Sequence, residues 1–413
     1  MAIIVQKYGG TSVVNADRIK RVAARIARTK DQGNRLVVVV SALGQTTDEL
    51  VALAHQVSRE PSGREFDMLL ATGEQVSIAL LAMALQDLGY DAISFTGSQV
   101  GIITDSSHTK ARIISADRNR ILRELDKDKA VIVAGFQGMS EGQEITTLGR
   151  GGSDTTAVAL ATVLPADVCE IYTDVDGVFT ADPRIVPEAR KLPAISYDEM
   201  LELAGAGAKV LHVRAVELAK KYGVKLHVRS SFTEEEGTLV VAETEKMEHM
   251  VMSGVSLDKQ EAKLSVADIP DVPGIAATLF TSLADRGVNV DMIVQSVGES
   301  GLNTISFTVP KGDLKAALET AEKVGAKLGA KGVQCDPQIA KVSAIGVGMS
   351  SHSGVAARMF RALGDAGINI HMISTSEIKI SCIVDEARAE EALTVVHNAF
   401  ELSKLTVEHG TDQ

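Results

Sequence analysis

The sequence predicts an α/β protein in which a mostly parallel sheet, flanked by helices, precedes two smaller domains. Two observations lead to this prediction. Residues 1 to about 245 alternate short apolar runs with helix-like segments, and fully apolar strands are typical of a parallel sheet covered on both faces. Farther along, residues 274–296 and 354–376 align without a gap and are identical at 11 of 23 positions. A spacing of 80 residues is too long for a solenoid unit and indicates two copies of one small domain.

The elements of the first region follow one another in a regular order. An apolar start at residues 3–5 leads into paired glycines, where a strand must turn. Helix-like segments at 16–33 and 73–89 each end on a glycine, as C-capped helices do. Three further strands end in Gly-rich or acidic stretches, namely "RLVVVVSALG" (35–44), "AVIVAGFQG" (130–138) and "CEIYTDVDGV" (169–178). Because ligands bind at the carboxyl ends of parallel strands, we expect these stretches to assemble the site.

The second region predicts the same β-helix-β unit twice. Each copy has a helix that ends at Gly287 or Gly367 and runs into an alternating strand, which we expect to cover Val288–Val290 or Ile368–Ile370. Further strands precede and follow each helix. The predicted domains are residues 1–245 for the sheet region and 264–335 and 341–410 for the two copies. A strand around 250–260 is expected to be shared with the copies.

Composition limits the classes of function. The chain of 413 residues is 45% hydrophobic and 23% charged, which is typical of globular proteins. Its net charge of −12 argues against binding to nucleic acid or anionic membranes. We expect no membrane-spanning run and no signal peptide, because Lys7 and the paired glycines interrupt the first apolar stretch. Three widely spaced cysteines without metal-ligand spacing favour a reducing, cytoplasmic location.

The stretch "VQKYGGTSV" (5–13) combines a cation with a glycine turn. Gly9 and Gly10 allow backbone amides to crowd around a ligand, and Lys7 with Thr11 and Ser12 would add a cation and small donors. This combination suits phosphate oxygens. A plain Gly-Thr-Ser turn is the alternative that the residues leave open.

The stretch "TTLGRGGSDTTAVALA" (146–161) predicts a Gly-rich loop that feeds a helix. A helix N-terminus presents unpaired amides and the positive end of the helix dipole, and Arg150 adds a fork suited to a carboxylate or phosphate. We therefore expect an anion site. Ser153 or Asp154 could also serve as an ordinary N-cap there.

Acidic residues follow two of the predicted elements. Asp174 lies directly at the end of a strand, and we expect it to be functional, whereas turn chemistry accounts for Asp176 and Asp182. Glu74 of "LLATGEQVS" (69–77) opens a helix. It is either a surface acid favoured by the helix dipole or an acceptor for a substrate ammonium group.

Several familiar catalytic patterns are missing. The sequence has no P-loop, no protein-kinase H-R-D or D-F-G set and no G-x-G-x-x-G after its first strand. Its nine histidines show no metal-ligand pairing. If phosphate is handled here, positioning and electrostatics must supply the catalysis, as phosphoryl transfer permits.

Taken together, these motifs and "VVVVSALGQTTDEL" (37–50) resemble the motif series of the aspartate kinases, and the tail resembles their paired ACT regulatory domains. The resemblance implies the amino acid kinase fold followed by two ferredoxin-like βαββαβ domains. It also implies transfer of the γ-phosphoryl group of MgATP to the side-chain carboxylate of L-aspartate, giving 4-phospho-L-aspartate, the first step toward lysine, threonine and methionine. No homoserine dehydrogenase domain follows, so the chain is similar to the monofunctional bacterial enzymes.

The resemblance also implies roles for individual residues. Lys7 and Asp174 would be catalytic, with Lys7 neutralising the transferring phosphoryl group. The implied ATP-binding residues are Lys7, Gly9, Gly10, Ser41, Thr173, Asp174, Phe179, Arg184 and Lys209. Ser41 would also shape the aspartate pocket, whose implied residues are Thr47, Glu74, Arg150, Gly151, Gly152, Ser153 and Asp154. Magnesium would arrive with ATP rather than on protein ligands, and no tightly bound cofactor is expected.

Lysine and threonine are the effectors that the resemblance implies, bound at an interface between ACT domains. The implied effector residues are Asp271, Gly274, Ala276, Asn289, Asp291, Gln295, Val355, Asn369, Ile370, Ser376 and Glu377. Met247, Met250 and Met252 could mark an internal translation start, which would give an α₂β₂ assembly with an ACT-only subunit. Ordinary linker methionines in a homo-oligomer are the alternative.

Two rival functions stay open from sequence. One is another amino acid kinase, acting on glutamate, carbamate or a nucleoside monophosphate. The other is a non-catalytic amino-acid sensor built on the duplicated domain. A sensor function would not explain why Lys7, Arg150 and Asp174 occur together in the sequence.

Overall fold

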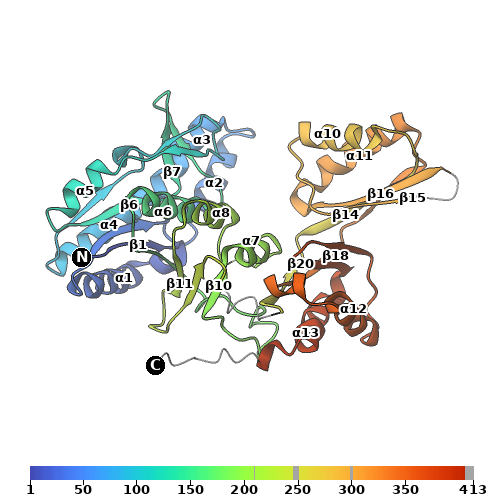
Figure 1. Cartoon of the computed structure of the whole chain (residues 1–413). Helices are drawn as coiled ribbons and strands as arrows, with labels where there is room; N and C mark the ends of the chain where they lie inside the picture. Colours follow the sequence, from blue (N-terminus) through green and yellow to red (C-terminus); the bar gives the residue numbers. More distant parts are fainter. Residues whose placement is uncertain (209, 245–250, 298–300, 405–413) are drawn as a thin grey trace. The chain divides into compact units, whose positions relative to one another are not determined.

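A computed structural model describes residues 1–208, 210–244, 251–297 and 301–404 (Figure 1). The described residues form two compact units. The first unit contains the residues up to Val178 together with 191–204 and 210–244. The second contains Phe179–Arg190, Gly205–Ala208 and the residues from 251 onward. Two short segments of the predicted catalytic region therefore belong to the second unit.

An eight-stranded, mostly parallel sheet organises the first unit, in the order β10-β12-β11-β9-β1-β2-β6-β3. Within this sheet only the β11–β12 pair is antiparallel. The strands are β1 (Ile3–Tyr8), β2 (Arg35–Val40), β3 (Ala92–Phe95), β6 (Ala130–Ala134), β9 (Val168–Thr173), β10 (Ala194–Ser196), β11 (Leu226–Ser230) and β12 (Thr238–Val241). A smaller sheet beside it has the order β5-β4-β7-β8, with β4 (Ile103–Thr104), β5 (Ile113–Ser115), β7 (Gln137–Ser140) and β8 (Ile145–Thr147).

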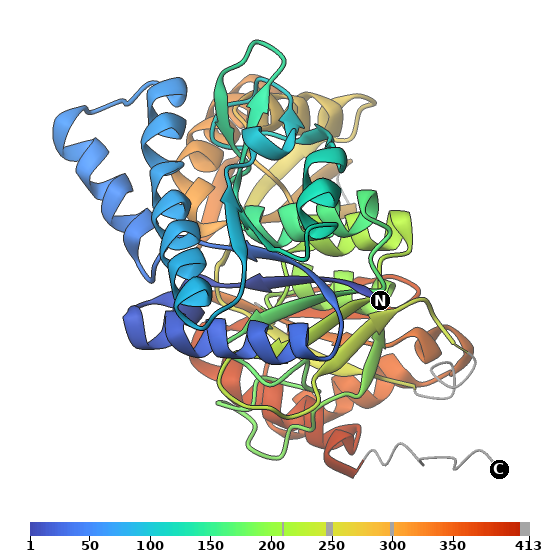
Figure 2. The ribbon, with the colours of Figure 1, turned by 90° about the vertical axis from the view of Figure 1, so that its left-hand side faces the viewer.

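Helices cover both faces of the large sheet. They are α1 (Ala16–Asp31), α2 (Thr46–Val57), α3 (Gly63–Leu70), α4 (Thr72–Asp87), α5 (Asn119–Leu125), α6 (Gly152–Val163), α7 (Tyr197–Gly205) and α8 (Val213–Tyr222). On one face, α1 and α4 bury apolar side chains against Tyr8, Val38 and Ile132. Figure 2 turns this face, with α1 in dark blue and α4 in lighter blue, toward the viewer.

The alternation of side chains along β1 places Lys7 on the other face of the large sheet. Successive side chains of a strand point to opposite faces, so Tyr8 faces α1 and α4 while Lys7 faces the side on which α6 packs. Lys7 therefore lies beneath the helix whose first turn we predicted to bind an anion.

The stretch Gly63–Asp87 is, by length and composition, apolar enough to cross a membrane. This corrects our expectation that no such run exists. Ile78, Leu81 and Leu85 from this stretch pack into the core between α1 and the sheet. Its apolar character therefore follows from its place as a core helix.

The second unit contains two four-stranded antiparallel sheets, each with two helices. The first sheet has the order β15-β16-β14-β17, and the second has the order β13-β18-β20-β19. The first βαββαβ unit consists of β14 (Glu261–Pro270), α10 (Ile275–Asp285), β15 (Ile293–Val297), β16 (Leu302–Pro310), α11 (Leu314–Leu328) and β17 (Gly332–Asp336). The second consists of β18 (Ile339–Ile345), α12 (Val355–Asp365), β19 (Met372–Thr375), β20 (Lys379–Asp385) and α13 (Ala389–Ala399), and its fourth strand is β13 (Gly254–Asp258).

The expected strands at Val288–Val290 and Ile368–Ile370 are wrong in position. Both stretches are irregular links, and the strands begin later, at Ile293 and Met372. Val288 and Ile368 are buried beneath their helices, whereas Asn289 and Asn369 are exposed. The alternation that suggested a strand comes from a link whose apolar side chains anchor it to the core.

The segment Phe179–Arg190 is built into the second βαββαβ unit. Ala181 and Val186 are buried in the same core cluster as Val255. Thr180 is fully buried, and its hydroxyl oxygen lies 3.0 Å from Nε2 of His397 on α13. Burial lowers the pKa of His397, so a neutral ring fits this contact.

Candidate active site

The candidate active site lies at the carboxyl end of β1, between β2 and β9. β1 pairs in parallel with β2 on one side and with β9 on the other. The strands that follow β1 in sequence are thus placed on both sides of it, and such a switch point is where open α/β sheets bind ligands. Gly9 and Gly10 follow β1, Ser41 follows β2 and Asp174 follows β9. Gly135 follows β6, which pairs in parallel with β2, so all four predicted stretches meet at one edge of the sheet.

Lys7 forms an ion pair with Asp154 from the first turn of α6. Its Nζ lies 2.6 Å from Oδ1 of Asp154, and both side chains are nearly buried, at 12% and 11% exposed. A lysine held this way has little freedom to point elsewhere. The pair fixes an ammonium group beside the N-terminus of α6.

Close backbone contacts after β1 require a glycine at Gly10, whereas a Cβ on Gly9 would lie no closer than 3.5 Å to its nearest neighbour, Nζ of Lys7. A Cβ on Gly10 would lie 2.9 Å from the carbonyl oxygen of Ala42 and 3.0 Å from that of Gly44. Gly9 donates its amide to the carbonyl of Tyr172 at 3.3 Å. These contacts join the loop after β1 to the loop after β2 and to the end of β9. The observed turn is therefore compatible with the prediction that this motif binds phosphate.

Ser41 and Ser153 connect the loop after β2 to α6. The Ser41 hydroxyl donates to Oγ of Ser153 at 3.0 Å, and the Ser41 amide donates to the carbonyl of Tyr8 at 3.1 Å. Thr47 lies nearby in sequence, in the first turn of α2, and is half-buried. Ser41 is thus the residue through which the loop after β2 reaches the helix that holds Asp154.

The loop around Arg150 has a backbone that only glycine tolerates well. Gly149 and Gly151 have φ of 74° and 70°, and a Cβ on Gly152 would lie 2.9 Å from side-chain atoms of Leu148 and Phe136. Gly151 is the N-cap of α6 and no side chain caps the helix, so the expected capping role of Ser153 or Asp154 is wrong. Their side chains are used elsewhere, on Ser41 and Lys7. Arg150 itself is exposed.

Glu74 is a buried carboxylate with one oxygen unused. It is 2% exposed in the first turn of α4, which excludes the surface-acid alternative. Oε1 accepts from the amide of Ala42 at 3.1 Å, while Oε2 is buried and has no hydrogen-bond partner among the described residues. Burial raises the pKa of Glu74 to about 7. An incoming cation would satisfy both the free oxygen and the buried charge.

The structure brings together only some of the residues that were predicted to bind the nucleotide. Thr173 ends β9 and donates its hydroxyl to Asp174 at 3.1 Å, next to the glycine turn. Phe179 and Arg184 belong to the second unit, where Arg184 pairs with Asp182 at 2.6 Å. Lys209 lies outside the described residues. No group of three or more His, Cys, Asp or Glu side chains that could hold a metal ion occurs in the described parts of the chain.

Three residues that sequence reasoning missed support the Arg150 loop. Asp67 of α3 is fully buried and accepts from the Thr109 amide at 3.0 Å and from the Thr147 hydroxyl. Arg214 and His212, at the start of α8, contact the loop from its other side. Their only sequence signal is an acid, an arginine and a histidine inside otherwise ordinary helical stretches.

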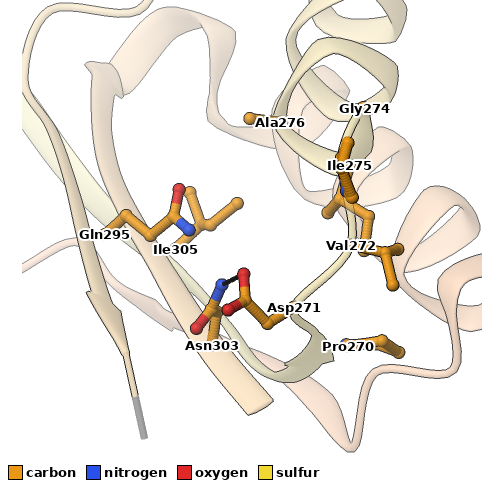
Figure 3. A pocket seen from close by; sticks show the side chains of 10 residues that line it. Pro270, Asp271, Val272, Gly274, Ile275, Ala276, Gln295, Asn303 and Ile305 are labelled. Atoms are coloured by element: carbon orange, nitrogen blue, oxygen red, sulfur yellow. Dashed lines mark hydrogen bonds between the residues drawn. The ribbon is translucent and has the colours of Figure 1, made fainter. Parts of the chain in front are cut away.

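A cavity of 480 Å³ opens in the first βαββαβ unit (Figure 3). It lies between the β14–α10 turn and strands β15 and β16, and four of its lining residues were predicted for the effector, namely Asp271, Gly274, Ala276 and Gln295. Asn303, which was not predicted, donates to Asp271 at 2.7 Å. The Oδ1 atom of Asn303 is buried and has no hydrogen-bond partner among the described residues.

The other predicted effector residues do not line this cavity. Asn289 is exposed on the link after α10, and Asp291 pairs with Lys341 of β18. The remaining five belong to the second βαββαβ unit, at Val355, Asn369, Ile370, Ser376 and Glu377. Met247 and Met250 lie outside the described residues, while Met252 is buried in the core of the second βαββαβ unit.

Comparison with known proteins identifies the family. The model of the Amino acid kinase family matches residues 2–230, and the ACT domain model matches residues 264–324 and 342–400. The aspartokinase of Mycolicibacterium smegmatis is 52% identical over 407 residues, covering 97% of both chains. The chain belongs to the aspartokinases of the amino acid kinase family. The aspartokinase of Geobacillus stearothermophilus is likewise 54% identical over 404 residues, covering 98% of each chain.

Solved aspartokinase structures share the fold. Aspartokinase III of E. coli, in complex with aspartate and ADP (R-state), is 27% identical and has a TM-score of 0.81, covering 96% of this chain and 99% of that one. The same E. coli enzyme with lysine and aspartate (T-state) has a TM-score of 0.75, covering 97% and 99%. The amino acid kinase fold and the paired ACT domains predicted from sequence are therefore confirmed.

Proposed function

We propose that this chain transfers the γ-phosphoryl group of MgATP to the side-chain carboxylate of L-aspartate, giving 4-phospho-L-aspartate. One observation carries the proposal. A nearly buried cation, Lys7, pairs with Asp154 on α6, and a buried acid with a free oxygen, Glu74, accepts from the amide of Ala42. The two are linked because Ser41, next to Ala42, donates to Ser153, next to Asp154. Aspartate needs both kinds of anchor, because it carries one ammonium group and two carboxylates. The domains 1–245 and 264–335 with 341–410 are proposed as the catalytic and regulatory parts.

Glu74 is proposed to receive the substrate ammonium group. Its free oxygen and raised pKa describe an acid that gains a favourable partner when a cation arrives. Arg150 supplies the matching fork for the α-carboxylate, and Thr47 lines the same pocket. The glycine backbone on either side of Arg150, together with Ser153, completes this loop. Both ends of the amino acid are then held, and its side chain is left to react.

The chemistry needs no general base, because the aspartate side chain is already a carboxylate at pH 7. Alignment and charge neutralisation must lower the barrier. Lys7 is proposed to neutralise the transferring phosphoryl group, and the amides of Gly9 and Gly10 to approach it. Asp154 keeps the Lys7 ammonium group in place until the nucleotide arrives. Magnesium enters with ATP as part of the substrate.

Asp174 and Thr173 are proposed to face the nucleotide from the end of β9, together with Phe179, Arg184 and Lys209. Asp174 would act through water on the magnesium of the substrate, because Mg²⁺ bound with substrate phosphates usually keeps several of its waters. Arg184 is exposed, and its guanidinium is proposed to bind a phosphate.

The cavity of the first ACT domain is proposed as an amino-acid effector site, with lysine and threonine as the expected ligands. Asp271 and Asn303 suit an ammonium group, and the amides that open α10 suit a carboxylate. The position aligned with Asp271 in the second copy is Ser351, which carries no charge, and the position aligned with Gln295 is the shorter Thr375. This difference favours the first copy as the place where a charged effector binds.

A substrate panel tests the proposed reaction against its rivals. Purified full-length chain is incubated with MgATP and, separately, aspartate, glutamate, carbamate or a nucleoside monophosphate, with hydroxylamine present to trap an acyl phosphate. We expect hydroxamate and ADP with aspartate alone. Turnover on another acceptor would replace the substrate, and effector binding without turnover on any acceptor would favour the sensor. An anti-ACT immunoblot of cell extract distinguishes a homo-oligomer from an α₂β₂ assembly, because only the latter contains a short ACT chain.

A further inference from the structure

We infer that Arg214 and His212 are positioning residues that fix the shape of the loop 148–152, and through it the direction of Arg150. Neither residue belongs to the substrate sites proposed above. The inference rests on the proposed function, because it concerns how the aspartate pocket is held. All the contacts that support the inference lie within the first unit.

Arg214 joins two separate backbone segments. Its Nη1 donates to the carbonyl of Leu148 at 2.6 Å, and its Nη2 donates to the carbonyl of Ala111 at 2.9 Å. The Ala111 amide in turn donates to the carbonyl of Thr147 at 2.9 Å. A planar guanidinium can bridge two carbonyls in a fixed geometry, which a lysine cannot do. The bridge ends two residues before Arg150.

His212 packs against the loop on the other side of Arg150. Gly151 lies so close to the imidazole that a Cβ there would be 2.1 Å from Cγ of His212. Burial is the main reason that the pKa of His212 is lowered, with the nearby Asp154 acting in the opposite direction. A neutral ring can lie against Gly151 without competing for the carboxylate of Asp154. His212 thus limits the movement of the left-handed turn at Gly151.

The opposite flank of the loop is already fixed by Asp67. Its carboxylate binds the Thr147 hydroxyl and the Thr109 amide, and a Cβ on Gly149 would lie 3.0 Å from the carbonyl of Thr109. The loop is therefore held on both flanks, by α3 and by the start of α8. The exposed Arg150 between them contributes its guanidinium to the ligand without having to support the loop.

This arrangement predicts that loss of the Arg214 bridge raises the KM for aspartate but not the KM for ATP. Removing the bridge should let Arg150 sample other directions, which weakens aspartate binding but leaves the phosphoryl end at Lys7 intact. For Arg214→Met we expect the KM for aspartate to rise about tenfold, the scale of one lost charge-assisted hydrogen bond, with kcat and the KM for ATP within about threefold. Arg214→Lys should recover part of the loss, because one ammonium group can reach one of the two carbonyls. His212→Ala should also raise the KM for aspartate, by a smaller factor, with kcat and the KM for ATP again little changed.

The matched control is Arg120→Met. Arg120 also donates a guanidinium hydrogen bond to a backbone carbonyl, that of Gln99 at 3.0 Å, and its guanidinium lies over the ring of Phe95 at the end of β3. We expect its KM for aspartate to stay within about twofold of wild type. An equal rise in both arginine variants, or a parallel loss of kcat and both affinities in Arg214→Met, would overturn the inference.

Hydrogen exchange provides a test that does not depend on the reaction. In Arg214→Met, we expect faster exchange at the amides of Ala111, Leu148 and Gly152, all of which are hydrogen-bonded in this loop region, and no change in α1. Unchanged exchange at these amides would contradict a positioning role even if wild-type chain failed to use aspartate. Conversely, faster exchange with no aspartate turnover by wild type would keep the inference and overturn the proposed function. Should Arg214→Met fail to fold, the same comparison is made with Arg214→Lys.

Discussion

Replacing Glu74 with glutamine should change both the stability of the protein and its use of aspartate in a pH-dependent way. Glu74 is 2% exposed, and burial raises its pKa from 4.5 to about 7. In the unfolded chain the group ionises near pH 4.5, whereas in the folded protein it stays protonated until about pH 7. Between these values the folded protein holds the extra proton. The free energy of unfolding therefore falls as pH rises through this window and is constant above it.

The size of the effect follows from the pKa difference. One pKa unit corresponds to about 1.4 kcal/mol, so ionising Glu74 lowers the free energy of unfolding by about 3 kcal/mol between pH 4.5 and pH 8. Glutamine cannot ionise. The difference in unfolding free energy between Glu74→Gln and wild type should thus shift by about 3 kcal/mol in favour of the variant over this range. A constant offset from the new amide group does not alter that shift.

Urea unfolding of both proteins from pH 4.5 to 8 measures the shift, and initial rates measure its functional counterpart. With a pKa near 7, the ionised fraction of Glu74 grows from roughly one-tenth at pH 6 to nine-tenths at pH 8, so kcat/KM for aspartate should rise about tenfold. The variant should lose this rise and bind aspartate more weakly. Glu199→Gln is the control, because Glu199 is also 2% exposed but accepts from both the amide and the hydroxyl of Ser196. A pH-independent stability difference for Glu74→Gln, or an equal shift in Glu199→Gln, would refute the reasoning.

Three further predictions concern other parts of the chain. Lys7→Ala should lower kcat about 10²-fold or more in steady-state assays, the usual scale for a group that neutralises transition-state charge, and near-wild-type turnover would remove Lys7 from the mechanism. Gly151→Ala should destabilise the protein by roughly 2 kcal/mol in urea titrations, because a left-handed residue gains a side chain that collides with His212, and unchanged stability would contradict the described loop. Asp271→Ala or Gln295→Glu should raise the lysine concentration needed for half-inhibition about tenfold, within the usual range of allosteric coupling, while kcat stays within about twofold. A joint loss of kcat and inhibition would argue against a separate effector site.

Local chemistry made much of the site predictable. Lys7 stood out because a cation interrupts an apolar strand before two glycines, and the structure pairs it with Asp154 from another predicted stretch. The Arg150 loop was recognisable because an arginine set between three glycines is not needed to cap a helix. Parallel-sheet topology then predicted that such stretches meet at strand ends, as those after β1, β2 and β9 do.

Long-range packing made the remainder inaccessible to sequence reasoning. The buried position of Glu74 depends on how α4 packs beside Ala42, and nothing within "LLATGEQVS" reveals it. Arg214 reaches Leu148 from 66 residues away, so its role has no local pattern. The link at Val288–Val290 was mistaken for a strand because its alternation reflects anchoring to a helix core rather than sheet pairing. Residues Phe179–Arg190 continue a kinase motif in sequence but fold with the second unit.

Aspartate-dependent ADP release from MgATP, measured with and without lysine plus threonine, tests the central claim most directly. We predict that turnover requires aspartate and falls when the two amino acids are added. The reason is that the catalytic part is proposed to act on aspartate and the ACT domains are proposed to bind lysine and threonine as inhibitors. Turnover without suppression would keep the kinase and redirect the search for its effectors. ADP release that does not depend on aspartate would contradict the proposed substrate and, with it, the roles given to Glu74 and Arg150.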